Sequence, residues 1–259
     1  SAEFLATQGI PTAFALGSLY GPDIYANTTV PSDPRVVNTA FQPEYYTDEL
    51  ILQGKFEHNF GPVTLQLSGN YQNIDLDSRQ DYNLNVGDRS LYAPALTALQ
   101  AAADGAFGAA VQSYLGPVAS ALIPNGPNGV LCTSDTDTIG LGSYGGNSIC
   151  SDNILQFDRS NQNNSSWSVE GILSSNFDGP FNFLLGGIYA KYHLTENSYY
   201  VNAFAIDYVT GVLGAFSSLA NALDPSFLGT PYFRNNTDDL RVKSYGLFGE
   251  AYYEFSDKL

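Results

Sequence analysis

The feature that most constrains the fold is an alternation of apolar and polar residues with a period of two. Over residues 63–72, Val, Leu, Leu, Gly and Tyr alternate with Thr, Gln, Ser, Asn and Gln. Successive side chains of a β-strand point to opposite faces, so this segment predicts a strand with one apolar and one polar face. The segment before it alternates less regularly, and Gly61-Pro62 between the two is a turn signal. We therefore expect a β-hairpin over about residues 45–73.

The pattern returns in residues 166–177, 181–201 and 244–255, which predicts about five long strands. The phrase Asn59-Phe60-Gly61-Pro62 recurs as Asn176-Phe177-Asp178-Gly179-Pro180, so an aromatic residue precedes each short turn. The other connections are long and cover about residues 1–44, 75–157 and 203–241. The second contains an Ala-rich stretch over residues 95–115 that predicts a short helix despite Gly105 and Gly108. Short turns on one side and long loops on the other are typical of outer-membrane barrels.

Composition excludes several classes of protein. The chain has 26 acidic and 10 basic residues, a formal net charge of −16, which argues against nucleic-acid binding. Aromatic residues make up 14% of the chain, more than disordered chains carry. No run of 18 apolar residues is present, so the sequence predicts no transmembrane helix. Strands of a membrane barrel alternate apolar and polar residues, so this criterion does not detect them.

The sequence predicts no enzymatic activity, no cofactor and no metal site. Its two histidines, His58 and His193, are far apart, and the common nucleophile, phosphate-loop and zinc-protease motifs are absent. It also contains no methionine and no charged leader followed by an apolar stretch. We expect the chain to be an internal piece of a longer protein.

Alternation alone fits both a soluble β-sandwich and a membrane barrel. Three features favour the barrel. The strands are longer than the five or six residues typical of a sandwich. Aromatic residues lie at strand ends, as in the girdles at membrane rims. The polar positions hold Gln, Asn, Ser and Thr, which suit a wet lumen. The expected fold is all-β, an antiparallel up-and-down segment of a transmembrane β-barrel with short periplasmic turns and long extracellular loops.

Several strand phrases resemble the barrel strands of TonB-dependent outer-membrane receptors, in particular those of alphaproteobacteria such as sphingomonads. The similar phrases are Tyr46-Thr47-Asp48-Glu49-Leu50, Asn59-Phe60-Gly61-Pro62-Val63-Thr64-Leu65, the run Asn176 to Gly187, and the run Lys243 to Tyr253. Such receptors have a 22-stranded barrel with a plugged lumen. The resemblance implies that residues 1–259 are part of the barrel domain, without the plug and the remaining strands.

The function that the resemblance implies is energy-dependent uptake of a scarce nutrient, such as a siderophore, a vitamin or a sugar, across the bacterial outer membrane. Its implied partners are outer-membrane lipid, a small-molecule ligand and the inner-membrane TonB energy-transducing complex, which would engage parts outside this chain. Two alternatives stay open. One is a soluble, secreted, β-rich binding module, for example for carbohydrate, and the other is a general porin of about 16–18 strands.

Three sets of candidate residues follow. Cys132 and Cys150 lie in the longest loop, and a disulfide between them, favoured over two free thiols, would be structural. The candidate lumen-facing residues are Lys55, Glu57, Glu170, Glu250 and Glu254. The candidate ligand contacts in the loops, which could equally pack the loops together, are Tyr82, Tyr92, Tyr144, Tyr199, Tyr200, Tyr208 and Tyr232.

Overall fold

The computed structural model of the chain describes residues 2–135, 142–225 and 233–256. The chain divides into two compact units that alternate along the sequence. The first, which we call the helical unit, consists of Ser1–Glu44, Ser78–Arg159 and Tyr199–Arg234. The second, the strand unit, consists of Tyr45–Asp77, Ser160–Ser198 and Asn235–Leu259. Each unit is described on its own below.

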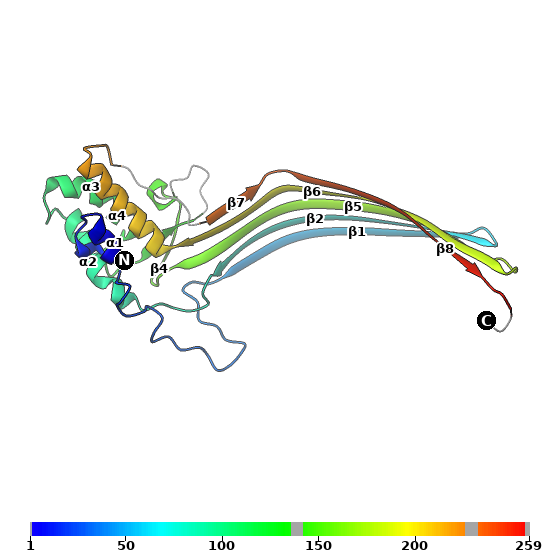
Figure 1. Ribbon diagram of the computed structural model, residues 1–259, viewed down its shortest axis with the longest axis horizontal. Coiled ribbons are helices and arrows are strands. Elements are labelled where there is room, and N and C mark those ends of the chain that lie inside the picture. The colour runs from blue at the N-terminus through cyan, green and yellow to red at the C-terminus, as the bar shows by residue number, and fades with distance from the viewer. Residues whose placement is uncertain (1, 136–141, 226–232, 257–259) are drawn as a thin grey trace. The chain divides into compact units, whose positions relative to one another are not determined.

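Long antiparallel strands form the strand unit (Figure 1). They are β1 (Glu44–Asn59), β2 (Val63–Asp81), β5 (Gln156–Ser175), β6 (Phe181–Ala203) and β8 (Leu240–Tyr253), with the short β7 (Phe233–Thr237) before β8. The sheet order is β1-β2-β5-β6-β7, and β8 also pairs with β6. The predicted antiparallel sheet is therefore present. Among the described residues it is an open sheet, because β1 pairs with β2 alone and does not close onto β7 or β8.

The two short turns are set by asparagine side chains and by one glycine. In the first turn the Asn59 Oδ1 accepts a hydrogen bond from the Gly61 N–H at 2.7 Å, and Gly61 has φ +98°, which favours glycine. In the second turn the Phe177 N–H donates to the Asn182 Oδ1 at 2.7 Å. These turns leave β1 next to β2 and β5 next to β6, as the alternating segments predict.

Helices account for more of the chain than the sequence pattern predicts, 24% against 43% for strands. The expected single helix over residues 95–115 is in fact two, α2 (Ala93–Ala103) and α3 (Ala109–Leu122). Gly105 and Gly108 separate them with φ +89° and +92°, a backbone conformation that ends a right-handed helix. A third long helix, α4 (Phe204–Ala220), occupies a connection for which no helix was predicted. No helix among the described residues has the length and apolar character needed to cross a membrane.

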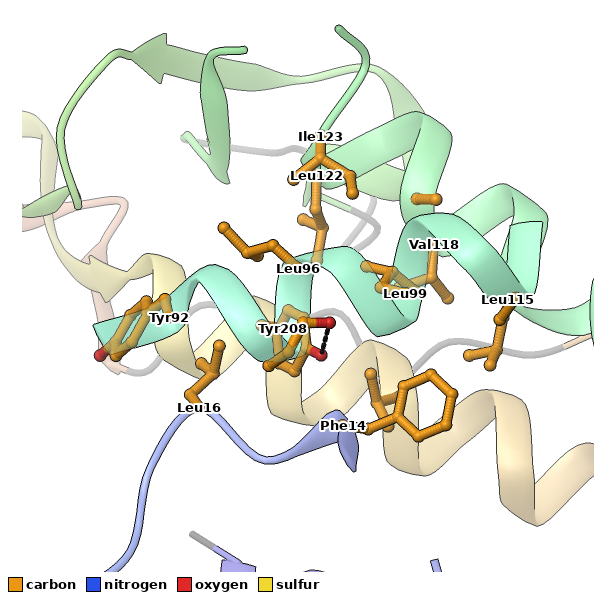
Figure 2. Packing of buried hydrophobic residues seen from close by; sticks show 14 of the residues in the cluster. Phe14, Leu16, Tyr92, Leu96, Leu99, Leu115, Val118, Leu122, Ile123 and Tyr208 are labelled. Atoms are coloured by element: carbon orange, nitrogen blue, oxygen red, sulfur yellow. Dashed lines mark hydrogen bonds between the residues drawn. The ribbon is translucent and has the colours of Figure 1, made fainter. Parts of the chain in front are cut away.

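Apolar side chains from all three long helices form the core of the helical unit (Figure 2). Leu96 and Leu99 of α2, Leu115 and Val118 of α3, and Tyr208 of α4 are fully buried or nearly so. The smaller elements of this unit are α1 (Ala2–Thr7), η1 (Thr12–Phe14), η2 (Arg89–Tyr92), β3 (Leu131–Ser134), η3 (Gly142–Gly145) and β4 (Ser148–Ser151). The connections over residues 75–157 and 203–241 thus contribute packed helices, whereas residues 17–39 of the first connection form neither helix nor strand and are largely exposed.

Candidate functional site

One face of the β6–β8 pair is apolar and exposed. Residues directly opposite each other in an antiparallel pair point to the same face. Leu247 and Tyr245 on this face are 92% and 84% exposed, so it is not covered as a core would be. Its cross-strand rungs are Phe181 with Tyr253, Phe183 with Ala251, Leu185 with Gly249, Gly187 with Leu247, and Tyr189 with Tyr245.

Neighbouring strands extend this apolar face across the sheet. The Trp167 ring on β5 lies 5.1 Å from the Tyr189 ring on β6, measured between centroids. A Cβ placed on Gly171 of β5 would meet the Leu67 side chain of β2 at 3.3 Å, so these residues share the face as well. We call this surface the apolar face. Its exposed large side chains also include Val169 and Leu185.

The apolar face is bounded by aromatic rungs. Phe181 begins β6 and Tyr253 ends β8, and Tyr189 and Tyr245 lie eight residues along these strands, with Phe183, aliphatic side chains and glycine between them. Eight residue steps along a strand extend about 26 Å. A tilted strand needs about 9–11 residues to cross the hydrocarbon core of a bilayer, so the distance between the aromatic rungs matches one crossing.

Two rungs of basic residues follow the aromatic rung on the same face. Lys191 is directly opposite Lys243, and His193 is directly opposite Arg241. Asp239, which separates β7 from β8, lies 2.9 Å from the His193 Nε2 and 3.1 Å from the Arg241 Nε. The hydrogen bond from His193 and the charge of Arg241 lower the pKa of Asp239 below its ordinary value. No ion pair within the described parts of the chain involves Lys191 or Lys243.

The opposite face, which we call the polar face, carries most of the candidate lumen residues. The Glu57 carboxylate lies 3.6 Å from the Lys55 Nζ and accepts a hydrogen bond from the Gln66 Nε2 at 3.1 Å. Glu250 accepts a hydrogen bond from the Tyr252 hydroxyl. Glu170 belongs to the polar parity of β5, whereas Glu254 follows the end of β8, where strand alternation no longer decides its direction.

A shallow depression of about 410 Å³ opens between β1, β2 and β5. It is lined by Gln53, Gly54, Lys55, Ser68, Gly69, Asn70 and Ser168. The Asn70 Oδ1 is buried and has no hydrogen-bond partner. These side chains supply hydrogen-bond donors and acceptors, which suit the binding of a polar solute.

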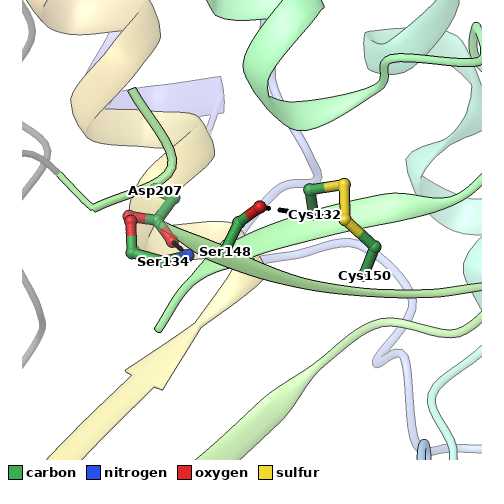
Figure 3. Close-up of a disulfide and its surroundings, with 5 residues drawn as sticks. All are labelled: Cys132, Ser134, Ser148, Cys150 and Asp207. Atoms are coloured by element: carbon green, nitrogen blue, oxygen red, sulfur yellow. Dashed lines mark hydrogen bonds between the residues drawn. A yellow bond between two sulfur atoms is a disulfide. The ribbon is translucent and has the colours of Figure 1, made fainter. Parts of the chain in front are cut away.

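Within the helical unit, a buried carboxylate organises the region around the disulfide (Figure 3). The Asp207 carboxylate accepts hydrogen bonds from the Ser134 N–H at 2.6 Å, the Ser134 hydroxyl at 2.8 Å and the Asn202 amide at 2.9 Å. Cys132 and Cys150 are directly opposite each other on β3 and β4 and are joined in a disulfide. The disulfide and Asp207 therefore hold the β3–β4 hairpin, and their role is structural.

Most of the candidate loop tyrosines are internal to the helical unit. Tyr92, Tyr200 and Tyr208 are buried, so they are not available as ligand contacts without unfolding. The Tyr144 hydroxyl donates to the Asp207 carbonyl oxygen at 2.5 Å, and the Tyr199 hydroxyl donates to Asp158 at 3.0 Å. Tyr82 is exposed, and Tyr232 lies outside the described residues.

Charged residues in the same unit are also paired. Asp135 lies 2.7 Å from Arg79 and 3.3 Å from Arg159, so its carboxylate pairs with two guanidinium groups.

Among the described residues, no three His, Cys, Asp or Glu side chains converge as metal ligands would. The feature that sequence reasoning missed is the pair of basic rungs, because it depends on which residues of β6 and β8 stand opposite each other.

Comparison with protein-family models, with curated proteins and with solved structures found no match to this chain.

Proposed function

We propose that the strand unit is part of the wall of an outer-membrane β-barrel, with its apolar face against lipid and its polar face towards the lumen. The observation that carries the proposal is the exposed apolar band, nine residues long with both rungs counted, from the rung Phe181–Tyr253 to the rung Tyr189–Tyr245. Outer-membrane barrels have an apolar band about 25 Å tall between two aromatic girdles. Soluble monomers rarely expose an apolar surface this extensive.

The open edges of the sheet support the same proposal. β1 has no partner on one side among the described residues, and β7 and β8 lie at the opposite edge. Unpaired backbone groups are not tolerated in lipid, so a sheet in a membrane needs further strands until it closes. Because the strand phrases resemble those of TonB-dependent receptors, we further propose the kind of transport. It is energy-dependent uptake of a scarce nutrient, with the TonB complex as energy source and no enzymatic activity.

The first experiment uses Trp167, the only tryptophan of the chain, which lies on the apolar face. Its fluorescence is measured after reconstitution of the complete barrel protein, with any tryptophan outside this chain replaced by Phe, into vesicles with and without brominated phosphatidylcholine. The control variant, Trp167→Phe with Ser168→Trp, moves the indole one residue along β5 and thus to the polar face. We expect bromine to quench the wild-type protein strongly and the control variant weakly.

Two other outcomes would point elsewhere. Equal lack of quenching in both proteins would contradict the membrane proposal and favour a soluble binding module. Strong quenching at position 167, without copurification of the complete protein with the TonB complex from detergent extracts, would favour a general porin. The second measurement thus separates the transport class from membrane insertion.

A further inference from the structure

We propose that the basic rungs at the end of the apolar face form a binding site for the anionic headgroup of a phosphate-bearing lipid. The site consists of Lys191 and Lys243, with Arg241 on the next rung paired with Asp239, and an acyl chain lying on the neighbouring apolar surface. This inference rests on the proposed function, because it assumes that the apolar face contacts lipid.

The first argument is the unfavourable arrangement of charge in the absence of a ligand. Lys191 and Lys243 stand directly opposite each other, and like charges in such cross-strand pairs are destabilising. The next rung places His193 opposite Arg241, whose Nε donates a hydrogen bond to the His193 Nε2 at 3.3 Å. An anion between the two lysines would turn this repulsion into attraction.

The second argument is how rarely this chain uses basic residues. It has ten Lys and Arg against 26 Asp and Glu, yet three of those ten lie on two adjacent rungs of one face. The Asp239 carboxylate contacts both His193 and Arg241. The positive charge left without a counterion is therefore on the two lysines. Lys243 is exposed and Lys191 is partly exposed.

The third argument is the surface beside the lysines. A shallow depression of about 380 Å³ lies on the sheet one rung away, lined in part by Val169, Gly171, Gly187, Tyr189 and Tyr245. The two glycines lack side chains that would fill it. Hydrocarbon on one side and ammonium groups on the other fit a molecule with an acyl chain and an anionic head, and not a free anion. Lysine stems pack along apolar surface while the charge reaches the headgroup level.

The experiment measures lipid preference with the complete barrel protein in detergent micelles. Native mass spectrometry counts the phosphatidylglycerol and phosphatidylcholine molecules retained from an equimolar mixture. We expect the wild-type protein to prefer phosphatidylglycerol. Each lysine near an anionic surface contributes about five-fold in binding, so Lys191→Gln with Lys243→Gln should lower the preference by about 25-fold. Lys191→Arg with Lys243→Arg should retain it.

The matched control is Lys55→Gln, which removes a strand lysine from the polar face and should leave the preference unchanged. Excess inorganic phosphate, compared with chloride of equal ionic strength, tests whether the ligand is the lipid or a free anion. Displacement by phosphate but not by chloride would overturn the lipid assignment. An unchanged preference in the Gln variant would overturn the site.

The Trp167 measurement separates failure of the site from failure of the proposed function. If bromine quenches Trp167 in the Gln variant and the preference for phosphatidylglycerol also persists, the membrane proposal stands and the lipid site is wrong. If bromine quenches neither the wild type nor the variant, the membrane proposal itself fails. Circular dichroism of each variant confirms that the strands are retained.

Discussion

At the scale of single residues, buried tyrosine hydroxyls hold the helical unit together. The Tyr208 hydroxyl donates to the Ala95 carbonyl oxygen at 3.1 Å, and the Tyr200 hydroxyl donates to the Ser134 carbonyl oxygen at 2.8 Å. A buried phenol with a hydrogen-bond partner is well accommodated when neutral, whereas its anion would be costly. Burial raises the pKa of Tyr92 to about 12 and raises the pKa values of Tyr144 and Tyr208.

This arrangement predicts that the helical unit loses stability in alkali. In the unfolded chain these tyrosines ionise near pH 10, whereas in the folded chain they stay neutral. Their contribution is complete below about pH 10 and declines as the pH rises towards the folded-state pKa values. Each of these tyrosines lowers the free energy of unfolding by up to about 1.4 kcal/mol per pH unit in this range. Denaturant unfolding followed by helix circular dichroism between pH 8 and about 12 measures this loss of stability.

Tyr208→Phe provides the variant for this test. It should cost about 1 kcal/mol at neutral pH through the lost hydrogen bond, and it should make the alkaline decline less steep. A decline of unchanged steepness in the variant would show that Tyr208 does not contribute to it.

At the scale of elements, the packing of α4 depends on a glycine. A Cβ on Gly211 would collide with the Tyr144 hydroxyl and would come within 3.0 Å of the Val118 side chain of α3. The Tyr144 hydroxyl is itself bonded to the Asp207 carbonyl oxygen, so the ring is held at this position. Gly211 therefore permits a close approach that helix propensity alone would disfavour.

Gly211→Ala should destabilise the helical unit by about 1–3 kcal/mol, the usual cost of overpacking, although alanine is the better helix former. Gly116→Ala in α3 is the matched control, because nothing lies within 4 Å of a Cβ there. The control should change stability by less than about 1 kcal/mol, because helix propensity favours alanine whereas the following Pro117 disfavours a Cβ-bearing residue in the helical conformation. Thermal unfolding of both variants measures the difference, and equal shifts of the same sign would refute the packing argument.

At the scale of the whole molecule, the proposed function depends on the two faces of one sheet having different surroundings. Leu185 and Leu184 are neighbours on β6, and they point to the apolar face and the polar face respectively. Leu185 is opposite Gly249, whereas Leu184 is opposite Glu250. The same substitution at these two positions therefore tests the environment of each face separately.

Leu185→Lys should lower the free energy of membrane folding by about 2–4 kcal/mol, the cost of a lysine near the bilayer midplane. Leu184→Lys should cost much less, because its charge faces water and Glu250. Folding of the complete barrel protein into vesicles, followed by the heat-dependent shift in gel mobility, measures the effect of each variant. If neither variant changes folding by more than about 0.5 kcal/mol, the apolar face meets water, as an ordinary protein surface does.

How much could be predicted from sequence differs between the two units. Alternation with period two specifies the long strands and their faces, because side-chain direction along a strand depends on position alone. The turns at Gly61 and Asp178-Gly179-Pro180 carry local signals too. α4 and the division into α2 and α3 were not predicted, since short apolar stretches interrupted by glycine leave the choice of structure to packing.

The sequence by itself determined the antiparallel strands, the short turns between them and the separation of apolar from polar side chains. Only the tertiary structure decided which residues of β6 and β8 stand opposite each other, and hence that Lys191 meets Lys243. It also decided that the candidate tyrosines Tyr92, Tyr200 and Tyr208 are buried. The physical reason is that the face of the sheet to which a side chain points follows from local strand geometry. Register between strands and burial depend instead on contacts between segments distant in the chain.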